Sequence, residues 1–416
     1  HLVGAPLDLG FKGSVTGMPP TKLSGNVDLS VPSVRGLATW AGTPLPPGPG
    51  LQKLAIKGRI DKTGPKLAFS NAAIALDAIT GKGSVAVTTG GARPVLTGAL
   101  TLDRLDLNPY LPAARTGAAP APSAKRGAGT HAAPKPAAEG WSDAPIDLAG
   151  LRRLDSDFDL KAAAILYRKI EIGPSALDLH LKGGKLTANL TQLSLYQGSG
   201  KGTLSVDGSG AAPELAMDFA LRGVAVGPLL AASAGPDRLE GTGNVDFTVA
   251  GSGKSERALV SALDGKGAFN LANGKLKGAN LIALAENSTT AVTGANAENA
   301  TSFGSLTGTF TIKNGVLKNE DLQLKSGVIP ITGAGTVSLP SRRLDYRVTV
   351  SLAGAIGVPV MVTGPWDDIS YRPDLAGALK GVVKTPGNVL DQLRGLGGKA
   401  GTGSNPADLL KGLLGR

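Results

Sequence analysis

Cysteine is absent from this chain of 416 residues. Its absence excludes a disulfide scaffold, a thiolate metal site and a cysteine nucleophile, and it fits an oxidising compartment. Aromatic residues make up only 4% of the sequence, which argues against a densely packed aromatic core. Hydrophobic residues still make up 42%, so the chain as a whole has enough apolar surface to fold.

Long apolar runs are also missing, because no stretch approaches the roughly 20 residues that a bilayer-spanning helix needs. The longest candidate, Leu352–Val362, is short and is interrupted by glycine and proline. The sequence starts at His1, with neither an initiator methionine nor a signal peptide. We therefore expect it to be an excised or processed piece of a longer protein.

Sequence motifs for catalysis, metal binding or cofactor binding are weak. The three histidines are His1, His131 and His180, and no pair of them has metal-ligand spacing. Gly253-Lys254-Ser255 is similar to the end of a phosphate-binding loop, but Thr248 stands where the first glycine of that loop belongs. We expect no cofactor, no metal ion and no catalytic residues.

The net charge is +11, from 43 basic and 32 acidic residues. Basic residues are scattered rather than clustered on one predicted helix, and few aromatic side chains are available to stack on bases. We therefore expect no nucleic-acid partner. The surplus positive charge indicates attraction to anionic lipid surfaces instead.

The sequence is rich in glycine, with 60 residues, and in short segments where apolar and polar residues alternate. In the stretch 301–373, Phe310 and Ile312 alternate with threonines, and Asn314-Gly315 then marks a turn. Period-two alternation bounded by turn residues is typical of half-buried antiparallel strands. The same pattern occurs over residues 1–111 and 141–300. Short helices are expected at 108–114, 227–234 and 255–263, and within 281–300.

An internal repeat becomes visible when the chain is shifted by 119 residues. Lys66–Leu111 then lies over Lys185–Leu230 without a gap, with identical pairs such as Gly81 and Gly200. A looser third copy spans Asn314–Ser351. A recurring unit that cannot cover its own apolar face is typical of an elongated array.

Four regions are predicted. Residues 1–111 and 141–373 are β-repeat regions. Residues 112–140 contain five prolines and no apolar periodicity, so we expect a mobile loop or linker that interrupts the array. Residues 374–416 form an amphipathic helical tail, which either caps the end of the sheet or rests on a membrane surface or plugs a groove.

The expected strands carry apolar residues on one phase of the alternation. The candidate groove residues are Leu177, Leu179, Leu193, Leu195, Leu204, Val206, Leu215, Met217, Phe219, Leu221, Val245, Phe247, Val249, Phe269, Leu271, Phe310, Ile312, Val337, Leu339, Leu344, Tyr346, Val348 and Val350. An apolar sheet face must be covered by a second layer, and the sequence has too few long amphipathic helices to supply one. Two architectures remain: sheets that face one another in sandwiches, or one strongly curved sheet whose inside is filled by ligand. Acyl chains suit the second, since each buried methylene contributes roughly 0.8 kcal/mol.

Ordered motifs give the sequence a family resemblance. They are WSDAPIDL at 141–148, LYQGSGKG at 195–202, DRLEGTG at 237–243, GTFTIKNGVL at 308–317, GAGTVSL at 333–339 and VPVMVTGPW at 358–366. Over roughly Trp141 to Pro373 the chain resembles the C-terminal domain of the AsmA family. The resemblance implies an elongated, taco-shaped β-groove in the periplasm, anchored in the inner membrane by an N-terminal helix that this piece has lost.

The expected fold is mainly β: an elongated, strongly curved antiparallel sheet forms an open groove from repeated β-meander units, with few helices and a helical tail. The predicted function is phospholipid binding and transfer in the periplasm, supporting outer-membrane lipid homeostasis without enzymatic activity. The predicted partners are glycerophospholipid acyl chains and membrane surfaces. The alternative is a structural envelope scaffold or outer-membrane assembly factor that binds proteins and no lipid. An enzyme comes third, because it would need clustered carboxylates that the sequence lacks.

Overall fold

The computed structural model describes residues 1–17, 22–45, 48–111, 140–233, 238–286, 300–351 and 357–374. Within these residues the protein is mainly β, with 67% strand. The predicted linker, apart from Gly140, and the predicted helical tail, apart from Asp374, lie outside the described residues.

Twenty strands form one long, curved, unclosed sheet in which each strand pairs with the next one in the chain. The first seven are β1 (Leu2–Gly4), β2 (Leu7–Thr16), β3 (Lys22–Val31), β4 (Leu54–Thr63), β5 (Lys66–Leu76), β6 (Ile79–Thr88) and β7 (Val95–Asp106). The next seven are β8 (Asp155–Tyr167), β9 (Ile170–Lys182), β10 (Lys185–Leu195), β11 (Gly198–Asp207), β12 (Glu214–Ala225), β13 (Leu239–Ser252) and β14 (Asp264–Lys277). The last six are β15 (Ala300–Lys313), β16 (Val316–Ser326), β17 (Ile329–Ser338), β18 (Arg343–Val350), β19 (Val358–Pro365) and β20 (Ser370–Pro373).

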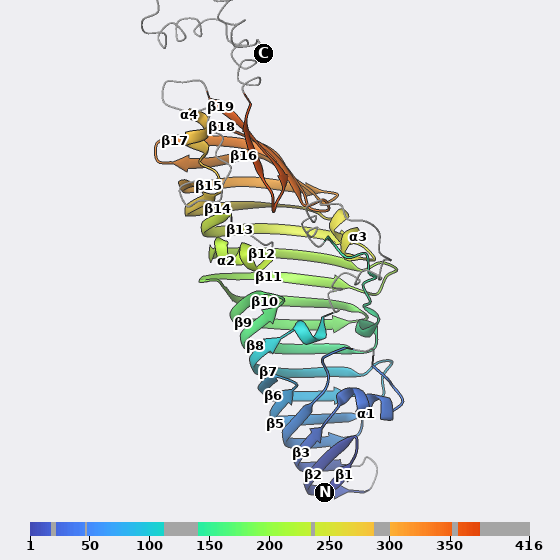
Figure 1. Cartoon of the computed structure of the whole chain (residues 1–416). Coiled ribbons are helices and arrows are strands. Elements are labelled where there is room, and N and C mark those ends of the chain that lie inside the picture. The colour runs from blue at the N-terminus through green and yellow to red at the C-terminus, as the bar shows by residue number, and fades with distance from the viewer. Residues whose placement is uncertain are drawn as a thin grey trace, which may run out of the picture.

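The strands are stacked like the rungs of a ladder, from β1 at one end to β19 at the other (Figure 1). At about 4.8 Å between neighbouring strands, the stack is about 90 Å long. Among the described residues no second sheet faces this one. Of the two architectures left open by the sequence, the single curved sheet is therefore the one observed, and the predicted fold class is confirmed.

One strand pair departs from the predicted antiparallel order: β7 and β8 are parallel. The chain leaves β7 at Asp106, at one end of the strands, and begins β8 at Asp155, at the other end. A chain that crosses between two strands in this way returns in the same direction, which makes the pair parallel. In the sequence, the predicted linker lies between these two strands.

The strand ends form two rims along the sheet, which we name after their helices. The α2 rim carries α1 (Val34–Trp40), the 3₁₀ helix η1 (Asn108–Tyr110), α2 (Val226–Ser233) and α4 (Leu281–Glu286). The α3 rim carries the 3₁₀ helix η2 (Ala149–Arg152) and α3 (Glu256–Ser261). The four predicted helical regions each contain a helix: η1 and α3 are shorter than predicted, α2 has the predicted length but begins and ends one residue earlier, and α4 lies within 281–300. Helices α1 and η2 were not predicted.

The internal repeat is present in the strand boundaries. A shift of 119 residues moves β5, β6 and β7 onto β10, β11 and β12, with both ends of each strand coinciding. Each copy continues into a short helix at the α2 rim, η1 in the first and α2 in the second. The sequence repeat is therefore a repeat of the β-meander.

A closed core fills the C-terminal end of the sheet. Val350 and Val360 have no exposed surface there, and Leu281 of α4 packs in the same cluster. Partly buried side chains from β13 and β14 and from β19 and β20 join this cluster, so the sheet curls onto itself at this end. Toward β1 the buried clusters are smaller.

Candidate ligand groove

The two faces of the sheet differ sharply in polarity. In β12, Leu215, Met217 and Phe219 alternate with the exposed Glu214 and Asp218. Residues directly opposite each other in neighbouring strands lie on the same side of a sheet, so the strand registers extend each apolar position into a row. One such row runs through Gly202, Phe219, Phe247, Gly267 and Phe310. The rows together form one continuous apolar face, which we call the groove face.

The structure places every candidate groove residue except Leu339 in a strand on the groove face. Leu339 lies in the turn between β17 and β18, beside the face. Leu271, Val348 and Val350 are at most 6% exposed and belong to the C-terminal core, where protein side chains surround them. The half-buried members, which a ligand can reach, are Leu179, Leu204, Val206, Leu215, Met217, Phe219, Val245, Phe247, Phe269, Phe310, Val337, Leu344 and Tyr346.

Strand irregularities bend and twist the sheet. Registers shift within β5, β10, β12 and β16, and a bulge both bends a strand and increases its twist. Gly200 and Gly202 pair with Leu193 and Leu190, the residues on either side of the β10 irregularity. The glycine-rich segment at 198–202 therefore relieves crowding at a bulge. The segment at 333–335 does the same opposite the irregularity in β16.

All eight phenylalanines of the chain lie on the groove face. Several of them, and one tyrosine, have a glycine directly opposite in the next strand. These pairs are Gly98–Phe158, Gly202–Phe219, Gly267–Phe310, Gly308–Phe269, Gly274–Phe303 and Gly335–Tyr346. A Cβ atom added to Gly308 would lie 2.8 Å from the Phe269 ring. Each ring therefore occupies the space above the glycine opposite.

A small polar group interrupts the face where β15 and β16 lose their regular pairing. Asn319 is 1% exposed, and its Nδ2 donates to the Thr309 carbonyl at 2.7 Å. Asp321 accepts from the backbone N–H and the hydroxyl of Thr309, both at 2.8 Å, and these bonds hold the pKa of Asp321 below its ordinary value. Burial raises the pKa of nearby Tyr346 to about 12. The side chains of Asn319 and Asp321 thus replace the backbone hydrogen bonds that β15 and β16 do not form at this point.

The two rims touch across the groove. Arg168, in the β8–β9 turn on the α2 rim, forms an ion pair of 3.0 Å with Glu256, at the start of α3 on the opposite rim. Asn108 fixes the turn, since its Oδ1 accepts the Arg168 N–H at 2.7 Å. We call the Arg168–Glu256 pair the clasp. Nearer the C-terminal end, Arg238 makes a second bridge by donating to the Asp367 carbonyl at 3.2 Å.

A segment that we call the rim strap, residues 140–154, follows the α3 rim from the β17–β18 turn to the start of β8. Its Trp141 Nε1 donates to the Leu339 carbonyl at 2.8 Å, and the Arg342 guanidinium lies 4.7 Å from the Trp141 ring. Farther along, the Ile146 N–H donates to the Lys254 carbonyl at 2.8 Å. The strap includes the WSDAPIDL motif, so the motif is explained by these contacts along the rim.

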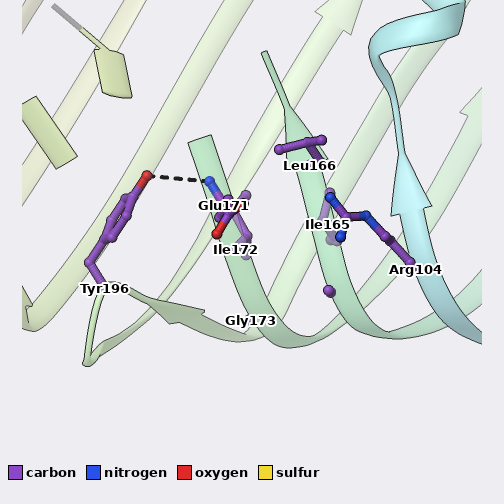
Figure 2. A pocket seen from close by; sticks show the side chains of 8 residues that line it. Arg104, Ile165, Leu166, Glu171, Ile172, Gly173 and Tyr196 are labelled. Atoms are coloured by element: carbon purple, nitrogen blue, oxygen red, sulfur yellow. Dashed lines mark hydrogen bonds between the residues drawn. The ribbon is translucent and has the colours of Figure 1, made fainter. Parts of the chain in front are cut away.

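A cavity of about 330 Å³ lies at the α2 rim among β7, β8 and β9 (Figure 2). Arg104, Ile165, Glu171, Ile172 and Tyr196 are among its lining residues, and the Glu171 N–H donates to the Tyr196 hydroxyl at 3.3 Å. This volume is at the lower end of the range for a small-molecule site. A long ligand would have to extend beyond it, along the groove face.

The sequence profile of the AsmA family matches residues 7–322, about three quarters of the chain. This protein belongs to the AsmA family. The family resemblance of the sequence is thereby confirmed, although the matched region begins upstream of Trp141 and ends before the motifs at 333–339 and 358–366. AsmA-family proteins are associated with the cell envelope, and the family is not known for an enzymatic activity.

Protein AsmA of Escherichia coli (strain K12) is 23% identical to this AsmA-family chain over 292 residues. The alignment covers 65% of the chain but only 47% of the relative, so the chain spans about half of that protein's length. No solved structure matches the chain. In the part of this AsmA-family chain that the structure describes, no helix is both long and apolar enough to cross a membrane. Within the same residues, no group of three acidic or histidine side chains is arranged to hold a metal ion.

The candidate list omitted the first half of the groove face of this AsmA-family protein. There the half-buried residues include Phe11, Leu29, Ile56, Ile60, Phe69, Ile74, Val85, Val87, Leu100, Phe158 and Leu160. The signal was available, because the same alternation occurs over residues 1–111. The clasp and the cavity had no such signal, since they join segments far apart in the sequence.

Proposed function

We propose that this AsmA-family protein binds phospholipids by their acyl chains along the groove face and passes them lengthwise through the groove. The observation that carries the proposal is the groove face itself. It is apolar, it continues across the strand stack, and outside the closed C-terminal core many of its side chains are only half-buried. Contiguous apolar surface of this extent marks a binding surface.

The physical chemistry of the groove fits hydrocarbon chains. Side chains such as Met217 and Phe247 remain half-buried, so a ligand that covers them removes further apolar area from water. Each methylene buried in this way contributes roughly 0.8 kcal/mol. The face makes few directional contacts, so a chain can slide along it without breaking hydrogen bonds. This arrangement supports our proposal of passive transfer, with no chemical step and no cofactor.

Headgroups would remain at the mouth of the groove, between the two rims, where water and charged side chains are available. The net charge of +11 favours contact with anionic lipid surfaces. For the location we propose the periplasm, where the protein would support outer-membrane lipid homeostasis. We also propose that the protein is tethered to the inner membrane.

Two neighbouring positions in β12 provide a sharp test. Met217 faces the groove and is half-buried, whereas Ala216 is exposed on the opposite face. A photo-crosslinking amino acid at position 217 should capture phospholipid on illumination, while the same amino acid at position 216 should capture little. Met217→Glu should lower the phospholipid that copurifies with the protein, measured by native mass spectrometry, at least fivefold. Ala216→Glu should leave it unchanged.

The outcome that contradicts the proposal is equally direct. A correctly folded wild-type protein that carries no phospholipid, and takes none from vesicles of phosphatidylethanolamine and phosphatidylglycerol, is not a lipid carrier. Equal crosslinking at positions 216 and 217 would show that lipid only coats the surface. Either result would favour the alternative, a structural scaffold of the cell envelope.

A further inference from the structure

The aromatic rings of the groove face occupy an unusual position. A ring on the concave face of a curved sheet can either lie against the wall or stand up into the lumen. In the glycine-opposed pairs the ring lies against the wall, because glycine leaves the space above its Cα empty. A Cβ would lie 2.7 Å from the ring at Gly98 and 2.5 Å at Gly202. Carbon atoms prefer about 3.5 to 4.0 Å, so a methyl group at either position would displace the ring, together with a backbone carbonyl oxygen that would lie 2.4 Å from it.

The arrangement recurs along the sheet. It is found between β7 and β8, between β11 and β12, between β14 and β15, and between β17 and β18. In the β11–β13 region Phe219 also stacks on Phe247, with ring centroids 5.7 Å apart and planes 22° apart. Along the groove face, aromatic rings therefore pack directly onto the backbone of the glycine residues opposite them.

We infer that the glycines opposite the aromatic residues set the free width of the groove, and that this width selects unbranched hydrocarbon chains over branched ones. The inference rests on the proposed lipid-binding function and adds a specificity to it. A low wall accommodates a narrow chain that bends along it. Methyl branches add width at regular intervals, and they meet the rings.

Gly308 is the most informative position for a test. The three atoms nearest to an added Cβ all belong to side chains, two of them to the Phe269 ring and one to the Asn319 amide. Gly308→Ala should therefore push the ring and the Asn319 amide rather than the backbone. Adding Phe269→Leu removes the ring that has to move. Gly150→Ala is the matched control, because an added Cβ there has no neighbour within 4 Å.

The experiment measures lipid uptake from vesicles of dioleoyl phosphatidylglycerol and of diphytanoyl phosphatidylglycerol, which share a headgroup and differ in chain branching. Native mass spectrometry counts bound lipid, and circular dichroism with a thermal melt checks the fold. Wild-type protein should take up the unbranched lipid at least threefold more than the branched one. Gly308→Ala should lower uptake of the unbranched lipid at least threefold. The double variant should restore it, and Gly150→Ala should match wild type.

The outcomes separate this inference from the proposed function. A wild-type protein that takes up neither lipid overturns both. Equal uptake of the two lipids by wild type, or a Gly308→Ala loss that Phe269→Leu does not restore, overturns only the role of the glycine-opposed rings. Should Gly308→Ala fail to fold, Phe269→Leu alone still decides, because a wider groove has to raise the uptake of the branched lipid. No increase in that variant contradicts the inference.

Discussion

Replacing Trp141 with alanine should release the rim strap from the β17–β18 turn. The substitution removes a hydrogen bond to the Leu339 carbonyl, worth about 1 kcal/mol, and a cation–π contact with Arg342, worth about 0.5 to 1 kcal/mol. It also removes the burial of a half-buried indole, and Trp→Ala at fully buried sites costs about 3 to 5 kcal/mol. We therefore expect the strap to lose about 2 to 3 kcal/mol. Trp141→Phe, which keeps an aromatic ring but loses the N–H donor, should lose about 1 kcal/mol.

Hydrogen exchange measures this loss locally, which matters because an elongated array need not unfold in one step. Two amides report on the strap: Ile146, bonded to the Lys254 carbonyl at 2.8 Å, and Arg257, bonded to the Ser142 carbonyl at 3.1 Å. Since 1.4 kcal/mol is a factor of ten, Trp141→Ala should speed exchange of both amides by roughly 30- to 150-fold, and Trp141→Phe by roughly fivefold.

Trp40→Ala is the matched control, because Trp40 is 71% exposed on α1, which lies between β3 and β4 in the chain. Exchange at the two reporter amides should stay within about twofold of wild type in this variant, well below the effect expected for a lost hydrogen bond. The reasoning fails if Trp141→Ala leaves these amides as protected as before. It fails equally if Trp40→Ala exposes them to the same degree, since the effect would then not come from the strap contact.

Three further predictions concern single contacts. The depressed pKa of Asp321 contributes stability that is present above the ordinary carboxyl pKa, near 4, and is lost as the pH falls through the lower folded value. The hydrogen exchange of the Thr309 amide, corrected for its intrinsic rate, should therefore become faster in acid. Asp321→Asn should abolish this pH dependence. A double-mutant cycle on Arg168 and Glu256, measured by urea unfolding, should give a coupling free energy of about 0.2 to 1 kcal/mol. The coupling should become smaller with added salt, because the two side chains are 62% and 41% exposed. A coupling that does not change with salt would contradict the clasp as an exposed ion pair. Asp77→Asn should lower the local stability of the segment between α1 and β4 by about 2 kcal/mol, because the Asp77 carboxylate accepts hydrogen bonds from three consecutive backbone N–H groups there. Hydrogen exchange of these three amides should become faster, and unchanged exchange would show that the carboxylate does not hold this segment.

Much of the sheet was predictable because its signals are local. Alternation at positions such as Phe310 and Ile312 depends only on the next few residues. Asparagine followed by glycine predicts a tight turn because both residues tolerate positive φ angles, and Asn314 and Gly315 adopt such angles in the structure. The repeat added longer range, since it placed Lys66 and Lys185 at the start of equivalent strands. The side of the sheet on which the candidate groove residues lie followed from the same alternation.

The remaining features depend on what folding brings together. The parallel pairing of β7 and β8 follows a crossing of the chain that alternation does not encode. Helix α1 has a serine N-cap at Ser33 but only seven residues, too few to show a helical period. The clasp joins Arg168 and Glu256, two exposed charges 88 residues apart, and no short-range pattern marks such a pair. Even the width of the groove depends on which residue lies opposite each ring.

The repeat in the strand boundaries provides a simple way to change the length of the sheet among related proteins. One 119-residue period, from the start of β5 to the start of β10, adds five strands, or about 24 Å at the usual strand spacing. Because each strand bonds only to its two neighbours, duplicating a period would lengthen the sheet without changes in the other strands. Relatives of different length would then bridge gaps of different breadth with the same building block.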